Sequence, residues 1–337
     1  MLTNYTDAMK NWQGRVDSTT DYDAFRWHQW VKPIDLNQDT LDVTEGKLKF
    51  CFIGFCSELG VERNKGRIGT ALGPDFTRKA MSGLPCAFSK EVALYDAGDI
   101  HLDHITLEEG QKLLGNAVAK IMELGMFPIV LGGGHETTLG HYKGEMTHAW
   151  KKAGVNKPDM AIVSFDAHFD MRPYENGGSS GSMFLQIADY CKKEGLKYGY
   201  MPIGIQRHSN TVSLFKKAQE LGVDYLLAKD IQEGSLATAL ERVDNFLYKH
   251  ESAYITVCTD VFSTAFAPGV SAPQALGLDP KDVVPIMKHV LRTRKVRGFD
   301  ICEISPRFDQ DSSTAKLGAV LIFMLVTTMA ELWDLEY

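Results

Sequence analysis

The segment VSFDAHFD places Asp166, His168 and Asp170 two residues apart, directly after an apolar run. Side chains at positions i, i+2 and i+4 of an extended chain lie on one face. Carboxylate and imidazole donors suit Mn²⁺ or Zn²⁺ rather than a metal that prefers thiolates alone. The spacing therefore predicts a metal site, with a helix cap beside a salt-bridged histidine as the structural alternative.

A further histidine, His135, stands in the segment GGGHE after the apolar run FPIVL. Three successive glycines allow the backbone to turn sharply and to approach a ligand closely. The segment matches neither GxxxxGK[ST] nor GxGxxG, so a phosphate-binding loop is disfavoured. His135 is therefore either another metal ligand or a structural histidine.

The stretch YITVCTDVFSTAFAPGVSAP presents a thiol and a carboxylate, Cys258 and Asp260, where a β-branched run ends. Residues two apart on a strand point the same way, so we expect both groups on one face. Taken alone, Cys258 would be a buried structural cysteine. In the later segment GFDICEISP, Glu303 ends an apolar strand, whereas Asp300 can equally well be structural.

Apolar runs of strand length alternate with helix-like segments along most of the chain. The predicted strands cover 48–55, 91–95, 126–131, 160–166, 200–205, 224–228, 254–260 and 295–304. The predicted helices cover 106–124, 137–151, 183–194, 209–221, 235–249, 280–292 and 311–333, with Thr106 as the N-cap of the first. This alternation is typical of an α/β protein with helices on both faces of a central, mostly parallel sheet, here of about eight strands. We expect residues 1–45 to form an N-terminal arm and residues 46–337 to form a single domain.

In such sheets ligands bind beyond the carboxyl ends of the strands, where these polar side chains stand. The candidate metal ligands are His135, Asp166, His168, Asp170, Cys258 and Asp260, with Glu303 left over for a substrate. This set exceeds what one ion needs and fits a two-metal site. Two ions that flank one water lower its pKa towards neutrality and yield a hydroxide nucleophile. The residues therefore point to metal-assisted hydrolysis of a C–N bond or of a phosphoester.

The composition excludes several other classes of protein. The chain of 337 residues carries 36 Lys and Arg against 43 Asp and Glu, and no long basic tract, which disfavours a nucleic-acid partner. The six cysteines form no CxxC pair, which suits a reducing cytoplasm. The polar N-terminus lacks the apolar core of a signal peptide. The apolar segment 319–330 is too short for a membrane span, and we expect it to be a buried helix.

Several ordered motifs, GGGHE, SFDAHFD and DVF followed by APGVSAP, resemble the ureohydrolase superfamily of arginases and agmatinases. Other segments, among them GVERNKGRIG, SSGSMF and IGIQRHSNT, resemble the formimidoylglutamase branch of that superfamily. The resemblance implies a three-layer α/β/α sandwich, two Mn²⁺ per chain and a homo-oligomer. It also implies hydrolysis of N-formimino-L-glutamate to L-glutamate and formamide by a metal-bridging hydroxide, a step of histidine degradation.

The resemblance assigns the ligands between two ions. It implies that one ion is bound by His135 and Asp170, the other by His168 and Asp260, and that Asp166 bridges the two ions. Where the family expects a second bridging aspartate, this chain has Cys258. A thiolate preserves the charge but suits Mn²⁺ less well than a carboxylate does. Cys258 therefore either binds a metal ion and shifts the metal preference, or leaves one site weak, or makes the site sensitive to oxidation.

The resemblance also assigns residues to the substrate. Glu303 matches the carboxylate that holds the amidine nitrogen, and Ser180 matches a serine that helps to hold the carboxylate end of the substrate. Arginases and agmatinases have a histidine where this chain has Phe184, which leaves Asp170 as the group that protonates the leaving amine. Four arginines in loops near the strand ends, in an acidic chain, favour a dicarboxylate substrate: Arg63, Arg67, Arg172 and Arg207. The alternatives are another ureohydrolase that releases urea from a guanidino acid, and a metal-poor relative without catalytic activity.

Overall fold

The apolar runs of the sequence form one sheet in the computed structural model, which describes residues 2–38, 41, 43, 46–154 and 157–337. In this part of the chain the ten strands are β1 (Tyr5–Thr6), β2 (Lys32–Pro33), β3 (Leu48–Cys56), β4 (Val92–His101), β5 (Phe127–Leu131), β6 (Met160–Phe165), β7 (Gly199–Ile205), β8 (Leu226–Leu227), β9 (Ser252–Cys258) and β10 (Val296–Cys302). The strands β3 to β10 correspond to the eight predicted runs, although β4 continues to His101, beyond the predicted end at residue 95. The two further strands, β1 and β2, come from the N-terminal arm.

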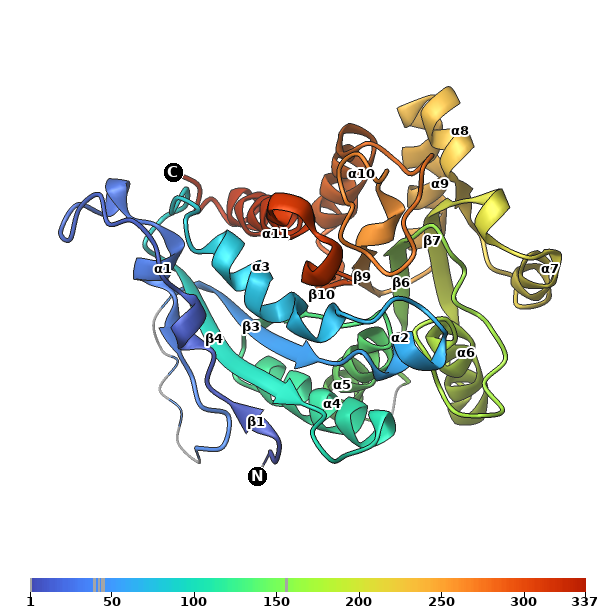
Figure 1. The fold of residues 1–337 in the computed structure, drawn as a ribbon, viewed down its shortest axis with the longest axis horizontal. Helices are drawn as coiled ribbons and strands as arrows, with labels where there is room; N and C mark the ends of the chain where they lie inside the picture. Colours follow the sequence, from blue (N-terminus) through green and yellow to red (C-terminus); the bar gives the residue numbers. More distant parts are fainter. Residues whose placement is uncertain (1, 39–40, 42, 44–45, 155–156) are drawn as a thin grey trace.

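The strands lie in the order β1-β4-β3-β5-β10-β9-β6-β7-β8, and β2 also pairs with β4. Among the described strands, only β1 pairs antiparallel with its neighbour. The predicted parallel sheet is therefore confirmed. The strands β9 and β10, which come last in the sequence, lie between β5 and β6 (Figure 1). The carboxyl ends of these four adjacent strands consequently meet at one edge of the sheet.

The described helices are α1 (Trp27–Trp30), α2 (Leu59–Arg63), α3 (Gly73–Met81), α4 (Leu107–Glu123), α5 (Thr137–Ala153), α6 (Met183–Glu194), α7 (Val212–Glu220), α8 (Ala228–Glu233), α9 (Leu236–Leu247), α10 (Pro280–Arg292) and α11 (Ser313–Glu331). The seven predicted helices are confirmed, with ends that differ by at most a few residues. The helix α4 begins as expected, because the Thr106 hydroxyl accepts the Glu109 N–H and the Glu109 carboxylate accepts the Thr106 N–H. The sequence patterns do not predict α3 or the short helices α1, α2 and α8.

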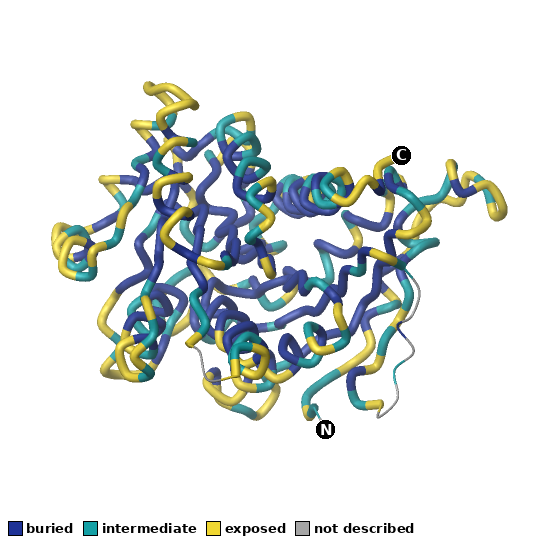
Figure 2. The backbone as a smooth tube through the Cα atoms, turned by 180° about the vertical axis from the view of Figure 1, so that it is seen from behind, coloured by how far each residue is buried: buried dark blue, intermediate teal, exposed yellow. Residues whose placement is uncertain are grey.

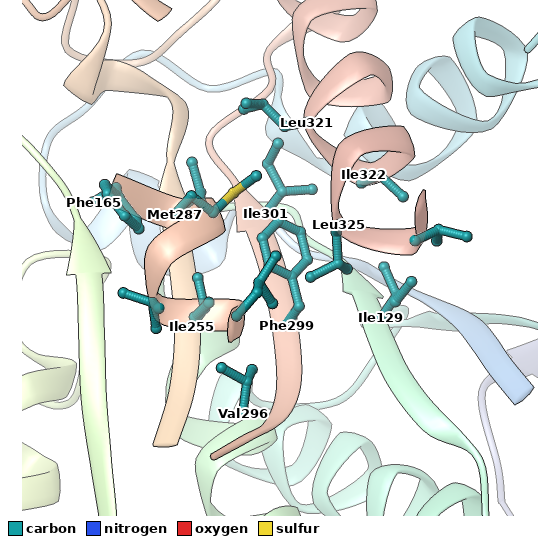
Figure 3. Packing of buried hydrophobic residues seen from close by; sticks show 14 of the residues in the cluster. Ile129, Phe165, Ile255, Met287, Val296, Phe299, Ile301, Leu321, Ile322 and Leu325 are labelled. Carbon is teal, nitrogen blue, oxygen red and sulfur yellow. The ribbon is translucent and has the colours of Figure 1, made fainter. Parts of the chain in front are cut away.

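Helices cover both faces of the sheet, which gives the three layers that the sequence predicts (Figure 1). On one face, side chains such as Ile129, Ile255 and Ile301 pack against α10 and α11 (Figure 3). The neighbouring positions Val130 and Ile162 point to the opposite face, which α4 to α7 cover. Successive strand residues alternate between faces, so the central strands are buried on both sides (Figure 2).

The N-terminal arm packs on the edge of the sheet. Its strands β1 and β2 pair with β4, and the indole of Trp27 is fully buried. The Trp27 ring contacts the rings of Phe52, Phe88 and Phe323. The predicted boundary between residues 45 and 46 adjoins residues 44–45, which lie outside the described part. The division into an arm and a single domain therefore stays a prediction.

The apolar segment 319–330 lies within α11. By length and composition the span Gln310–Glu331 could cross a membrane, but 56% of its most apolar window is buried inside the protein. Leu321, Ile322 and Leu325 belong to the largest hydrophobic cluster and face the sheet (Figure 3). These contacts are those of a core helix, as the sequence predicts.

Candidate metal centre

The predicted ligands lie at the carboxyl ends of four adjacent strands. His135 follows β5, Asp166 follows β6 directly, and Cys258 is the last residue of β9. Glu303 is the first residue after β10. Since β5, β10, β9 and β6 are neighbours in the sheet, segments far apart in the sequence meet here.

Asp166 stands between two histidines. Its Oδ2 atom lies 2.9 Å from Nδ1 of His135, and its Oδ1 atom lies 3.5 Å from Nδ1 of His168. On the first side, Oδ2 of Asp170 lies 3.0 Å from Nδ1 of His135. On the second side, Oδ2 of Asp260 lies 3.0 Å from Nδ1 of His168. The centre therefore has two sides that share the Asp166 carboxylate.

The chain between Asp166 and Asp170 differs from the extended strand that the spacing suggested. The strand β6 ends at Phe165, and Asp170 has a φ of 46°, so the segment turns. The turn directs Asp170 to His135 and leaves His168 to face Asp260. Glu303 also has a positive φ, of 69°. Non-glycine residues held in this region cost free energy and cluster at functional sites.

Cys258 and Asp260 do not share a strand face. The strand β9 ends at Cys258, and a short 3₁₀ helix, Thr259–Val261, turns the next residues. The donor atoms of Cys258, His135 and Asp166 lie within 4.8 Å of one another, as do those of Asp166, His168 and Asp260. The thiol therefore belongs to the His135 side of the centre and Asp260 to the His168 side.

Burial dominates the electrostatics of the centre. Burial and the charge of Asp166 raise the pKa of Asp170 to about 6. Burial also disfavours the charged form of Asp166, but hydrogen bonds to His135 and His168 lower its pKa below the ordinary value. Burial and the nearby carboxylates raise the pKa of the Cys258 thiol well above its usual range. A divalent cation at this place would favour the deprotonated form of all these groups.

The residues present fit a divalent metal. Oδ1 of Asp260 is buried and has no hydrogen-bond partner within the described part of the chain. A buried polar atom without a partner is costly, and a bound cation would remove that cost. Oxygen and imidazole donors dominate the set, which suits Mn²⁺. Cys258 is the one soft donor in the two groups.

Glu303 lies directly beside the centre. Its Oε1 atom accepts the backbone N–H of His135 at 2.9 Å, and its Oε2 atom accepts the hydroxyl of Ser271. Burial raises the pKa of Glu303 to about 8, with further contributions from Glu136 and Asp260. Each carboxylate oxygen retains a lone pair for a further donor.

The sequence patterns miss two residues of the centre, Ser271 and Gln274. Ser271 orients Glu303, and Nε2 of Gln274 lies 3.4 Å from Nε2 of His168. Both residues stand in the loop that follows Asp260. The sequence did point to this loop, because its APGVSAP motif resembles that of the ureohydrolase superfamily. The motif does not, however, indicate which of its side chains contact the centre.

Phe184 packs directly on a predicted ligand. Its ring meets the His135 imidazole edge to face, with centroids 5.5 Å apart, and stacks on the Tyr200 ring at 4.1 Å. The ring is fully buried. An apolar wall therefore stands where the relatives are expected to carry a histidine.

The predicted substrate-binding residues are less closely grouped than the ligands. The Arg63 guanidinium pairs with Glu108 at 2.6 Å, so this cation already has a carboxylate partner. Arg67 donates to the carbonyl groups of Val270 and Ser271, which places it against the loop that holds Glu303. Arg172 and Arg207 are exposed, and Ser180 is buried beside Gly60, whose carbonyl accepts the Ser180 N–H.

A third group of potential ligands, Cys56, Asp99 and His101, lies elsewhere in the fold. The Asp99 carboxylate pairs with the buried Arg78 at 2.6 Å, and Nε2 of His101 lies 2.9 Å from the hydroxyl of Thr6. These partners account for the charge of Asp99 without a metal. The carboxylates around Asp166 differ, because their partners are the imidazoles of His135 and His168 and no ion pair with an arginine or lysine is found for them in the described part of the chain.

Comparison with known proteins identifies the family of the chain. The family model of the arginase family matches residues 48–327. The chain is 54% identical to formimidoylglutamase from Clostridium tetani over 96% of both chains. It is 40% identical to formimidoylglutamase from Fusobacterium nucleatum over 94% of this chain and 96% of the relative.

Solved structures share the fold at lower sequence identity. Formimidoylglutamase from Bacillus subtilis superposes with a TM-score of 0.78 at 21% identity, over 94% of this chain and 96% of that chain. Formiminoglutamase from Trypanosoma cruzi, solved with Mn²⁺, superposes with a TM-score of 0.73 at 22% identity, over 84% and 94% of the two chains. The match of the family model and the full-length identity to curated relatives lead to one conclusion: this chain belongs to the arginase family.

Proposed function

We propose that this protein hydrolyses N-formimino-L-glutamate to L-glutamate and formamide with two bound Mn²⁺. The observation that carries the proposal is a centre with two histidine–carboxylate sides joined by Asp166, in a chain 54% identical to a formimidoylglutamase. Hydrolysis of this amidine adds one water and breaks the bond between the formimino carbon and the amine nitrogen of glutamate.

The ligand assignment follows the two sides of the centre. His135, Asp170 and Cys258 would hold one ion, His168 and Asp260 would hold the other, and Asp166 would contact both. When bound, two Mn²⁺ would lower the pKa of a water between them and so supply a hydroxide nucleophile at neutral pH.

Glu303 is the group that we expect to hold the formimino nitrogen. Ser271 and the His135 N–H fix both of its oxygens and leave lone pairs for the N–H groups of an amidinium. Burial raises its pKa to about 8, and a cationic partner would lower that pKa and so favour the carboxylate form. An amidinium is such a partner, and it becomes more electrophilic when its positive charge is held in place.

Asp170 is the candidate for moving the proton to the leaving amine. In the metal-free chain burial and the charge of Asp166 raise its pKa to about 6, and a bound divalent cation would lower that pKa. The apolar ring of Phe184 covers His135 on the adjoining side, where it excludes water and offers no competing proton carrier.

Recognition of the two substrate carboxylates falls to the loops around the centre. Arg67 is anchored to the loop that carries Ser271, and Ser180 is buried in the loop next to Gly60. Arg172 and Arg207 are exposed cations that could pair with a carboxylate. Arg63 would first have to break its ion pair with Glu108, so we expect it to contribute less to substrate binding than the other arginines.

The decisive experiment is a product analysis on Mn²⁺-reconstituted protein. The substrates are N-formimino-L-glutamate, arginine, agmatine and 4-guanidinobutanoate, with glutamate, formamide and urea measured separately. We expect glutamate and formamide in equal amounts from the first substrate and no urea from the others. Urea from a guanidino substrate, without formamide, would sink the proposal in favour of another ureohydrolase.

Metal analysis tests the remaining alternative, a relative without catalytic activity. We expect about two Mn²⁺ per chain after reconstitution. Fewer than about one ion per chain together with no turnover would favour a metal-poor binding protein. A cytoplasmic location and a homo-oligomer stay predictions, and the six free cysteines support the first.

A further inference from the structure

A second set of polar side chains is buried behind the metal centre, between the sheet and α5. We call it the Asp300 cluster, and it comprises Thr138, His141, Glu145, Tyr254, Thr256 and Asp300, all of them fully buried. Asp300 and Tyr254 come from β10 and β9, whereas His141 and Glu145 are one turn apart on α5. None of these residues is among the predicted metal ligands.

Thr256 joins this cluster to the metal centre. Its Oγ1 atom lies 2.9 Å from Nε2 of His135 and 2.5 Å from Oδ1 of Asp300. A hydroxyl has one proton to donate, and a carboxylate can only accept. The Thr256 proton therefore goes to Asp300, and the Thr256 oxygen must accept from His135. These hydrogen-bond directions require a proton on Nε2 of His135. The other ring nitrogen, Nδ1, lies on the side of Asp166 and Asp170 and remains available for a metal ion.

The remaining contacts keep Asp300 an acceptor. Its Oδ2 atom accepts the hydroxyl of Tyr254 and lies 3.2 Å from Nδ1 of His141. The other ring nitrogen of His141 lies 3.0 Å from Oε1 of Glu145. Two carboxylates on either side of an imidazole favour its cationic form. Burial alone would raise the pKa of Asp300, but the hydrogen bond from His141 and its charge lower it.

We propose that Asp300 is a positioning residue, held by His141 and Tyr254, which acts through Thr256 to present Nδ1 of His135 to the metal. The proposal rests on the assignment of His135 as a ligand in the proposed function. Partners that fix the tautomer and orientation of a ligating histidine typically contribute a factor of about 10 to 100 in metal affinity.

The test compares variants that differ in one hydrogen-bonding group. Thr256→Val removes the acceptor for His135 and keeps the shape of the side chain, whereas Thr256→Ser keeps the hydroxyl. Asp300→Asn replaces the carboxylate that accepts the Thr256 proton and so sets the direction of the hydrogen bonds from His135 to Asp300. Thr328→Val is the matched control, because the Thr328 hydroxyl is buried in α11 without a hydrogen-bond partner among the described residues.

The readout is Mn²⁺ affinity, measured by electron paramagnetic resonance of free Mn²⁺ on protein stripped with a chelator. We expect Thr256→Val and Asp300→Asn to weaken binding by about 10- to 100-fold and Thr256→Ser to retain it within about threefold. Thr328→Val should bind as the original chain does. If Asp300→Asn does not fold, Tyr254→Phe removes one donor to Asp300 and should weaken binding by a smaller factor.

A spectroscopic signature separates positioning from general stabilisation of the core. In ring-¹⁵N-labelled protein loaded with Cd²⁺, His135 should bind through Nδ1 and carry its proton on Nε2, and this pattern should be lost in Thr256→Val. Wild-type Mn²⁺ affinity in Thr256→Val, or an equal loss in Thr328→Val, would overturn the proposal. A chain that binds Mn²⁺ but hydrolyses no formimino substrate would overturn the proposed function alone.

Discussion

Cys258 places a soft sulfur donor beside His135 and Asp166, in a group that otherwise offers oxygen and imidazole nitrogen. The thiol is almost fully buried, and its raised pKa keeps it protonated in the absence of a cation. A metal ion that uses this sulfur must first displace the proton, which a carboxylate would have lost already at neutral pH.

Replacing this thiol with a carboxylate should therefore strengthen Mn²⁺ binding. We expect Cys258→Asp to tighten the weaker of the two sites by about tenfold, because Mn²⁺ prefers oxygen donors. Titration calorimetry with Mn²⁺ measures the change, and Cys51→Ala, a buried cysteine on β3, is the control. Unchanged or weaker binding in Cys258→Asp would count against Cys258 as a ligand.

Individual site residues could be predicted from the sequence where the chain itself positions them. Asp166 and Glu303 each follow a strand directly, so the pattern of apolar runs locates them. The partner of Arg63 could not be predicted, because Glu108 is 45 residues away. The turn at Asp170 could not be predicted either, because the spacing of residues does not reveal a positive φ at an aspartate.

At the scale of elements, β10 approaches α5 so closely that only glycine fits at position 298. A Cβ atom there would lie 2.0 Å from Oε1 of Glu145 and 2.9 Å from Nε2 of His141. Gly298 therefore makes room for the side chains that hold Asp300.

Filling that space should destabilise the protein. We expect Gly298→Ala to lower the free energy of unfolding by about 1 to 3 kcal/mol, the usual cost of overpacking a core. Urea denaturation measures this change. The control is Gly83→Ala, at an exposed glycine where an added Cβ would meet nothing within 4 Å. Equal stability of the two variants would contradict the close approach of β10 and α5.

The helix α5 should also make stability depend on pH. Burial alone would lower the pKa of His141, but hydrogen bonds to Asp300 and Glu145 raise it to about 9. Between these two pKa values the folded state keeps a proton on His141. The unfolded state, with an ordinary histidine pKa of about 6.5, releases that proton at lower pH. The contribution of His141 is complete below about pH 6.5 and is lost as the pH rises through about 9.

Urea midpoints between pH 6 and pH 9 test this dependence. The midpoint should fall as the pH rises, and His141→Gln should show a flatter profile over the same range. A midpoint that rises with pH in the original chain, and falls only after the substitution, would show that His141 is not held as the cation.

Elements could be predicted where a local signal exists. The helix α4 has the capping pair of Thr106 and Glu109, and its apolar side chains repeat with helical spacing. The helix α3 carries a charged residue, Arg78, on its buried face beside Met81, and this arginine pairs with Asp96 and Asp99 of β4, partners that the local sequence does not reveal. The strands β1 and β2 have two residues each, too few to show any alternation.

At the scale of the whole molecule, the N-terminal arm contributes to the core rather than merely covering it. The ring of Trp27 is completely buried among aromatic side chains of β3, α11 and the segment before β4. We expect Trp27→Ala to cost about 3 to 5 kcal/mol in the free energy of unfolding.

Trp27→Phe is the control, since a smaller aromatic ring retains part of the contact and should cost less. Chemical denaturation of both variants, followed by circular dichroism, gives the comparison. A loss below about 1 kcal/mol in Trp27→Ala would indicate that the arm packs loosely on the domain.

The insertion of β9 and β10 between β5 and β6 has a consequence for the order of events during synthesis. A chain leaving the ribosome presents β5 and β6 long before β9 and β10 exist to join them. His135 and Glu303, which share a hydrogen bond, are 168 residues apart. Such distant contacts form late, because closing a long loop costs entropy before any contact compensates it. The metal centre therefore cannot nucleate folding, and metal availability should govern the maturation of a finished chain rather than the speed at which it folds.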